Sequence, residues 1–363
     1  MRLGVEAALV DGRLVPGDVS VDGGRVAAVG IEHGNGSGIA VPGFVDLQVN
    51  GFAGVDFLGA DADGYAAAGE ALLETGVTSY LPTFITSAEE DLVAALRAVP
   101  ERPRGPRILG VHLEGPFLSP VRLGTHGRDG RRDPDPMLLD RLLAAGSVKL
   151  MTLAPELPGA LDLIDTLHER GVTVSLGHSD ATAAQAHAAF DRGVRTVTHV
   201  FNAMRPLAHR DPGIVGAALA RPEVVVQAIV DGVHLDRDIV RLLWRVAAGR
   251  LALVTDAIAG AGLGDGTYAL GEMEIVVADD VVRREDGVLA GSALTMAEAV
   301  RNLVAEDVPL GRALEAATTV PARVLGLPEV GRLTPGGRAD LVVLDDGLEV
   351  VRTLIGGETR VAG

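Results

Sequence analysis

Residues 194–213 read VRTVTHVFNAMRPLAHRDPG, and this stretch changes character in a way that packing alone does not require. It begins with the β-branched run Thr196–Thr198, which is typical of a buried strand. The strand delivers His199 at its carboxyl end, and a loop with Asn202 and Arg210 follows. A ligand-type side chain at a strand end, followed by amide and guanidinium groups, indicates a functional site. The alternative is a core histidine followed by solvated arginines, and the rest of the chain weighs against it.

The same unit occurs eight times: a short apolar run ends on a polar residue and precedes a helix-like segment. The runs cover residues 43–47, 78–81, 108–113, 148–153, 172–176, 196–198, 224–230 and 251–254. Eight strand–helix units predict an α/β fold of the (β/α)8 TIM-barrel type, in which functional side chains gather at the carboxyl ends of the strands. A doubly wound open sheet is the alternative, but no Gly-rich dinucleotide fingerprint follows the first strand.

Both ends of the chain have a different pattern. Residues 1–41 and 330–363 contain short alternating strands joined by turns such as Asp22-Gly23-Gly24. We therefore expect both termini to form one small β-sandwich domain together, with the barrel spanning residues 42–329. Within the barrel, the Gly-rich residues 260–291 are expected to form a hairpin or a lid.

Polar residues mark two expected helix starts. Ser179 and Asp180 precede a helical pattern over residues 181–190, and Ser87 precedes one over residues 88–99 with acidic residues in its first turn. Two further helices, near residues 294–305 and 310–318, are expected to close the barrel.

The composition excludes several classes of protein. The formal net charge is -17 and the isoelectric point is about 4.9, so no broad positive surface is available for nucleic acid or an anionic membrane. The absence of cysteine excludes disulfides, thiolate metal sites and a cysteine nucleophile. The chain has no charged-then-apolar leader and no apolar run of membrane-spanning length, so we expect a cytoplasmic protein.

Four strand ends carry residues with metal chemistry, namely Glu114, His178, His199 and Asp256. One carboxylate and two neutral imidazoles form a three-ligand set that leaves a position open for water, as in catalytic zinc sites. Because each residue comes from a different strand, only a closed barrel brings them together. Asp256 would then lie beside the water as a base. These residues predict a catalytic metal site.

Six motifs occur in order along the chain: PGFVDLQVNG (42–51), HLEGPF (112–117), GHS (177–179), THVFNAM (198–204), DGVH (231–234) and VTDA (254–257). Together they resemble the motifs of the N-acetylglucosamine-6-phosphate deacetylases of the amidohydrolase superfamily. HLEGPF with FNAM is quite specific to these deacetylases. A tail, GGRADLVVL at 336–344, is similar to one shared across the superfamily and is less specific. The resemblance covers nearly the whole chain.

The resemblance implies an enzyme that hydrolyses the acetamide of N-acetyl-D-glucosamine 6-phosphate to D-glucosamine 6-phosphate and acetate. It implies that Glu114, His178 and His199 hold one divalent metal, and that Asp256 is the general base and then the acid. It places His126 near the acetyl carbonyl. The remaining implied substrate contacts are Gln48, Asn202, the backbone of Ala203, and His234 and Arg210 at the phosphate. In this family the arginine reaches the neighbouring subunit's site, so a homodimer is expected.

The first strand lacks the His-x-His pair with which metal-dependent barrel hydrolases often begin, and has Gln48-Val49-Asn50 instead. Amide oxygens are weak ligands for transition metals, so we expect one metal per chain, Zn²⁺ or alternatively Fe²⁺.

Three alternatives stay open at this point. One is a preference for N-acetylgalactosamine 6-phosphate. Another is a different barrel amidohydrolase, such as a cyclic amidase, which would predict a first-strand His-x-His or a carboxylated lysine, and Lys149 is the only lysine on a strand. The third is a non-catalytic barrel that binds sugar phosphate, which would not need Asp256 beside the ligand set.

Overall fold

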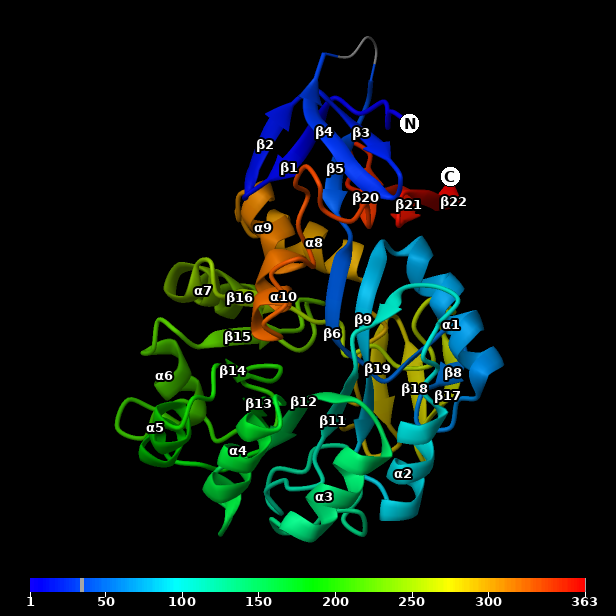
Figure 1. Ribbon diagram of the computed structural model, residues 1–363. Coiled ribbons are helices and arrows are strands. Elements are labelled where there is room, and N and C mark those ends of the chain that lie inside the picture. The colour runs from blue at the N-terminus through cyan, green and yellow to red at the C-terminus, as the bar shows by residue number, and fades with distance from the viewer. Residues whose placement is uncertain (33–35, 363) are drawn as a thin grey trace.

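The computed structural model describes residues 1–32 and 36–362, and its centre is a barrel of parallel strands with helices around it (Figure 1). Neighbouring barrel strands from β9 to β16 pair in parallel, and β6 pairs with β9. All eight predicted runs form strands, so the predicted (β/α)8 fold is confirmed. The strands are β6 (Phe44–Val49), β9 (Val77–Ile85), β11 (Val111–Glu114), β12 (Val148–Leu153), β13 (Thr173–Leu176), β14 (Thr196–Val197), β15 (Val225–Ala228) and β16 (Leu251–Leu253), with a short extra strand β10 (Arg107–Ile108) beside β9.

The barrel closes between β6 and β16 through a few bonds instead of a full ladder. The backbone N–H of Asp256 donates to the carbonyl oxygen of Gln48 at 2.9 Å. The buried carboxylate of Asp46 accepts a hydrogen bond from the Thr255 hydroxyl at 2.6 Å. Burial raises the pKa of Asp46 to about 7. The strand end that carries Gln48 is therefore fixed to the strand end that carries Asp256.

Helices α1 to α7 lie between successive barrel strands, and α8 to α10 follow the last strand. The apolar face of each helix packs on the barrel, and Leu, Val and Ala make up most of the resulting core, as the low aromatic content predicts. The helices are α1 (Ala62–Glu74), α2 (Glu89–Ala98), α3 (Pro136–Ala145), α4 (Ala160–Glu169), α5 (Ala183–Asp191), α6 (Gly213–Leu219), α7 (Arg237–Ala247), α8 (Met296–Ala305), α9 (Leu310–Ala316) and α10 (Thr319–Val324).

The two predicted helix starts are wrong in detail. Helix α5 begins after Thr182, whose hydroxyl accepts from the third backbone N–H of the helix in a capping box. The side chains of Ser179 and Asp180 bind neighbouring side chains instead, so they are not available as caps. Helix α2 begins after Ala88 without a side-chain cap, and the Ser87 hydroxyl donates to a carbonyl oxygen at the end of β9.

Strands from both ends of the chain form one six-stranded sheet beside the barrel, and both termini lie in this part of the molecule (Figure 1). The hairpin of β3 and β4 packs on one face of the sheet, where its valines meet Ala8, Leu341 and Val343. On the other face, Val342 and Leu344 belong to the barrel core, because successive strand residues point to opposite sides. The division at residues 41/42 and 329/330 stays a prediction. The strands are, in sheet order, β2 (Arg13–Pro16), β1 (Ala7–Val10), β5 (Ile39–Pro42), β20 (Leu341–Leu344), β21 (Val350–Ile355) and β22 (Glu358–Ala362), with β3 (Asp18–Asp22) and β4 (Arg25–Ile31) in the hairpin.

The Gly-rich residues 260–291 contain an antiparallel sheet of three strands, β17 (Gly266–Leu270), β18 (Met273–Ala278) and β19 (Val281–Arg284). The expected β-structure in this insertion is present, and its movement as a lid stays a prediction. Two short strands, β7 (Gly51–Phe52) and β8 (Val55–Asp56), follow β6. Within the described residues, no helix combines the length and the apolarity that a bilayer crossing requires.

Candidate active site

Three side chains that could hold a metal ion meet at the carboxyl ends of β11, β13 and β14. The ligand-type atoms of Glu114, His178 and His199 all lie within 4.8 Å of one another, and all three residues are buried. Oε1 of Glu114 is 2.8 Å from Nε2 of His199 and 3.2 Å from Nε2 of His178. A carboxylate with two imidazoles is the donor set of a catalytic site for a divalent transition metal. The structure thus brings together the three residues that the sequence predicts as ligands.

The backbone is strained at these strand ends. His178, His199 and Asp256 have φ angles of 47°, 24° and 52°, in the left-handed region that residues with a Cβ rarely adopt. Such conformations cluster at functional sites, where the surrounding structure holds them against their cost of about 1–3 kcal/mol each. The turn at each residue directs a side chain across the barrel mouth instead of along the sheet.

The imidazole of His178 is oriented by the loop that precedes α3. Its Nδ1–H donates to the carbonyl oxygen of Arg122 at 3.0 Å, which leaves the lone pair of Nε2 facing Glu114 and His199. Burial lowers the pKa of His178 to about 4, so the ring is neutral at physiological pH. A neutral imidazole with a fixed tautomer is the form that binds metal ions.

Asp256 lies next to this group with 9 % of its surface exposed. Burial and the charge of Glu114 raise its pKa to about 6. Its Oδ1 accepts a hydrogen bond from Nδ2 of Asn50 at 2.7 Å. A carboxylate with this pKa is ionised at neutral pH and is more basic than an exposed aspartate, which suits a general base.

His126 lies beside His178, with ring centroids 4.3 Å apart, and is also buried. Its Nδ1 accepts a hydrogen bond from the backbone N–H of Thr86 at 3.2 Å, so the ring proton lies on Nε2. That Nε2 is 3.4 Å from Oε2 of Glu114. The ring therefore presents an N–H donor to the space beside the candidate metal ligands.

These groups line one cavity of about 250 Å³ at the barrel mouth, and Asn202, Ala203 and His234 share its wall. His234 is oriented by Asp231, because its Nδ1–H donates to Oδ2 of Asp231 at 2.7 Å. The remaining ring nitrogen of His234 is then available for a ligand. The amide nitrogen of Asn202 donates to the carbonyl oxygen of His199 at 3.1 Å, so Asn202 also supports the strand end.

Known proteins with similar sequences and structures indicate the family to which this chain belongs. A model of the amidohydrolase family matches residues 39–360. The chain belongs to the amidohydrolase family. The chain is similar to N-acetylglucosamine-6-phosphate deacetylase of Bos taurus, with 40% identity over 89% of this chain and 83% of the relative. It is 38% identical to N-acetylgalactosamine-6-phosphate deacetylase of Escherichia coli O157:H7, over 87% and 86% of the two chains. The structure of an aspartate-to-alanine mutant of N-acetyl-D-glucosamine-6-phosphate deacetylase from Mycobacterium smegmatis, in complex with N-acetyl-D-glucosamine 6-phosphate, superposes with a TM-score of 0.93 at 38% identity. The match covers 99% of this chain and 98% of that one.

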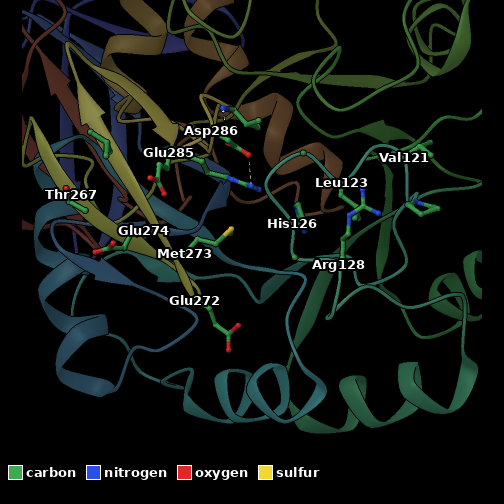
Figure 2. Close-up of a pocket in the computed structure, with 16 residues that line it drawn as sticks. Val121, Leu123, His126, Arg128, Thr267, Glu272, Met273, Glu274, Glu285 and Asp286 are labelled. Carbon is green, nitrogen blue, oxygen red and sulfur yellow. Dashed lines mark hydrogen bonds and ion pairs between the residues drawn. The ribbon is translucent and has the colours of Figure 1, made fainter.

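The cavity of this amidohydrolase opens into a wider cleft of about 1150 Å³ between the loop that carries His126 and the sheet of β17 to β19. Figure 2 shows Val121, Leu123 and Arg128 on the loop side, and Met273 on the opposite side. Cleft and cavity share Gly124, His126 and Val288 in their walls. The cleft is therefore an approach to the cavity for a ligand of sugar size.

Two predicted substrate residues do not line the cavity. Gln48 is fully buried, and its Nε2 donates to Oε1 of Glu114 at 3.1 Å. A contact of Gln48 with substrate stays a prediction. Arg210 is exposed at the tip of a tight turn, in which the backbones of Ala208 and Asp211 exchange two hydrogen bonds of 3.1 Å. A carboxylate partner for Arg210 is absent from the described residues. Whether its guanidinium serves a neighbouring subunit stays a prediction.

Sequence reasoning missed several residues of the amidohydrolase site. Thr86 orients His126 through a backbone N–H, and backbone groups leave no mark on residue type. Asn50 lines the cavity and binds Asp256, and its place two residues after Gln48 at a strand end could have signalled this. Leu270 and Leu289, from the β-insertion and the segment after it, complete the wall. Ordinary apolar residues of this kind carry no motif.

Proposed function

We propose that the chain hydrolyses the acetamide of N-acetyl-D-glucosamine 6-phosphate to D-glucosamine 6-phosphate and acetate. One observation carries the proposal: a single buried cavity in an amidohydrolase barrel gathers a metal-type ligand set, the carboxylate of Asp256 and the N–H of His126. Amide hydrolysis needs an activated water, a proton for the leaving amine and a donor for the oxyanion. The groups in this cavity supply each of these.

A divalent metal fits Glu114, His178 and His199 for reasons of donor chemistry. One anionic oxygen and two neutral imidazole nitrogens suit Zn²⁺ first and Fe²⁺ second. The ring orientation imposed on His178 by the carbonyl oxygen of Arg122 supports this assignment. When bound, such an ion lowers the pKa of water and polarises a carbonyl group. We propose one Zn²⁺ per chain, because the amides of Gln48 and Asn50 are already engaged with carboxylates.

Asp256 moves the protons in the proposed reaction. Its carboxylate takes a proton from the water as the water oxygen bonds to the acetyl carbon. His126 donates its Nε2–H to the oxygen on which negative charge develops. When the carbon–nitrogen bond breaks, Asp256 returns the proton to the nitrogen, which leaves as the amine of glucosamine 6-phosphate. The acetyl group leaves as acetic acid, which loses its proton to solvent to give acetate, and Asp256 is ionised again.

The phosphate is proposed to bind His234 and an arginine. His234 lies in the cavity wall, and its contact with Asp231 at Nδ1 leaves Nε2 free for the phosphate. Arg210 lies outside that wall on an exposed turn, held at its base by the Nε of Arg205, which donates to Asp211 at 2.7 Å. We propose that Arg210 reaches the phosphate in the cavity of a second subunit, since guanidinium groups suit bidentate phosphate contacts. The proposed assembly is thus a homodimer.

The second candidate function is the same reaction on the galactosamine epimer of the sugar. Relatives named for glucosamine and for galactosamine derivatives have nearly equal identity to this chain. N-acetylgalactosamine 6-phosphate is therefore the alternative substrate. The non-catalytic barrel is disfavoured, because a binding protein would not need a buried carboxylate of raised pKa beside the ligand set. We place the activity in the cytoplasm, since a phosphorylated sugar does not readily cross a bilayer.

The proposal is tested by measuring acetate release from N-acetylglucosamine, its 6-phosphate and the 6-phosphate of N-acetylgalactosamine, with metal analysis of the same sample. We expect release from the 6-phosphates, a higher kcat/KM for the glucosamine derivative, and little turnover of the unphosphorylated sugar. A metal-loaded sample that releases no acetate from any of them would refute the proposal. A higher kcat/KM for the galactosamine derivative would select the second candidate.

A further inference from the structure

Two buried amides lie at the carboxyl end of β6, Gln48 in the strand and Asn50 directly after it, and each donates a hydrogen bond to one of the two carboxylates of the site. Nε2 of Gln48 donates to Oε1 of Glu114 at 3.1 Å. Nδ2 of Asn50 donates to Oδ1 of Asp256 at 2.7 Å. One segment of three residues therefore reaches both carboxylates.

The amides are themselves held firmly. The backbone N–H of Asn50 donates to the carbonyl oxygen of Ala257 at 2.8 Å, and the backbone oxygen of Gln48 accepts from the N–H of Asp256 at 2.9 Å. Gln48 is 0 % and Asn50 3 % exposed. These bonds fix the backbone that carries the amides to the backbone around Asp256.

The contact with Asn50 matters because Asp256 has few other partners. Among the described residues, Nδ2 of Asn50 is the only side-chain donor to its carboxylate. A base that must accept a proton from water needs one oxygen held and the other free. The hydrogen bond from Asn50 holds Oδ1, and no side chain among the described residues donates to Oδ2.

The amide group also suits both positions by its charge. A lysine or arginine would pair with Asp256 as an ion and lower its basicity, and an aspartate or glutamate would repel both carboxylates. Histidines would compete for a metal ion. An amide orients a carboxylate through an N–H without adding charge. The oxygens of both amides, Oε1 of Gln48 and Oδ1 of Asn50, have no hydrogen-bond partner among the described residues, so donation to the carboxylates is the contact that fixes each group.

We propose that Gln48 and Asn50 are positioning residues with separate tasks. Gln48 orients Glu114 for the metal, and Asn50 orients Asp256 for proton transfer. The inference rests on the proposed function for the roles of Glu114 and Asp256. It assigns Gln48 to the metal ligand in place of the substrate.

The test removes each donor with a side chain of similar shape, in Gln48→Met and Asn50→Leu. Metal affinity is measured by competition with a chelator, and kcat and KM are measured at saturating Zn²⁺. For Gln48→Met we expect metal affinity to fall about 10–100-fold, with kcat at saturating metal within about threefold of wild type. For Asn50→Leu we expect kcat to fall about 10–100-fold, with KM and metal affinity within about threefold.

Asn302→Leu is the matched control. Its amide donates to the backbone oxygen of Val230 at 2.8 Å, away from both carboxylates. We expect no change in either quantity for this variant. If the apolar side chains prevent folding, as a thermal melt would reveal, Gln48→Ala and Asn50→Ala relieve crowding, and the same division between metal affinity and kcat is expected.

A crystal structure of metal-loaded Asn50→Leu provides a readout without activity. We expect the carboxylate of Asp256 to rotate or to occupy several positions, while Glu114, His178 and His199 stay in place. An inactive wild-type protein would refute the proposed function but leave the chelator and structural tests decisive. The inference is overturned if Gln48→Met keeps its metal affinity and Asp256 is unmoved in Asn50→Leu, or if both variants lose the same property to the same extent.

Discussion

Replacing Asp256 by asparagine should separate the chemistry of the site from its architecture. The amide of the new residue can turn its oxygen toward Nδ2 of Asn50, where Oδ1 of Asp256 now accepts at 2.7 Å. The amide nitrogen then points to the place of the proton-accepting oxygen, and an NH₂ group cannot take a proton from water. Loss of a general base lowers kcat by about 10²–10⁴-fold, or about 2.7–5.4 kcal/mol of activation free energy.

Asp256→Asn should keep or increase the stability of the fold although it loses activity. Burial raises the pKa of Asp256 from 3.8 to about 6, so ionisation of this group at neutral pH opposes folding. Asp256→Asn removes that buried charge, and its melting temperature at pH 7.5 should equal or exceed that of wild type. The assay is acetate release at pH 7.5 together with metal content and a thermal melt. A folded, metal-loaded variant with kcat within tenfold of wild type would refute the assignment of Asp256 as base.

Four further predictions concern the site and the closure of the barrel between β6 and β16. Because the base must be ionised and a bound cation lowers its pKa further, kcat/KM of wild type should fall on the acid side at or below about pH 6, with a slope near one; a limb well above pH 7 would contradict this. Arg210→Ala should raise KM for the phosphorylated sugar about 10–100-fold, which is the effect of losing one hydrogen bond to a charged group. If the arginine acts across subunits, heterodimers co-expressed from Arg210→Ala and Asp256→Asn chains should recover activity. Verified heterodimers without activity would exclude that arrangement. Chelation should abolish activity and Zn²⁺ restore it at one metal per chain, whereas Gln48→His with Asn50→His should raise the ratio toward two; a wild-type ratio of two would overturn the single-metal assignment. The pKa of Asp46 is raised from 3.8 to about 7, so the folded state binds more protons than the unfolded state and stability should decrease as pH rises between these values. Asp46→Asn should flatten the dependence of melting temperature on pH. An unchanged dependence would count against a raised pKa for Asp46.

The barrel was predictable because its signal is local and repeated. Each apolar run that ends on a polar residue is readable within a few positions, and eight such runs restrict the topology strongly. The three candidate metal ligands could be predicted for the same reason, since strand order alone brings Glu114, His178 and His199 to one barrel mouth. Their identity as imidazole and carboxylate groups indicates their chemistry directly.

Individual contacts between residues far apart in the chain could not be predicted from the sequence. Asp46 and Thr255 are 209 positions apart, and neither residue type indicates that their hydrogen bond closes the barrel. The contact between Gln48 and Glu114 was missed because an amide at a strand end fits a ligand contact as well as a carboxylate contact. The start of α5 was misplaced because several hydroxyl and carboxylate residues compete for the cap, and tertiary contacts decide which is free.

The shared sheet of the two chain ends restricts when the protein can complete its fold during synthesis. Strand β5, which leads into the first barrel strand, pairs on one side with β1 and on the other with β20. Strand β20 follows all the barrel strands in the chain, so until it has been synthesised β5 presents an open edge and the apolar side chains that Val342 and Leu344 cover remain in water. An exposed edge beside an apolar surface is prone to associate with other chains. A nascent chain of this protein therefore needs protection until β20 has been synthesised, and a truncation that removes β20, β21 and β22 should lead to aggregation of the whole barrel.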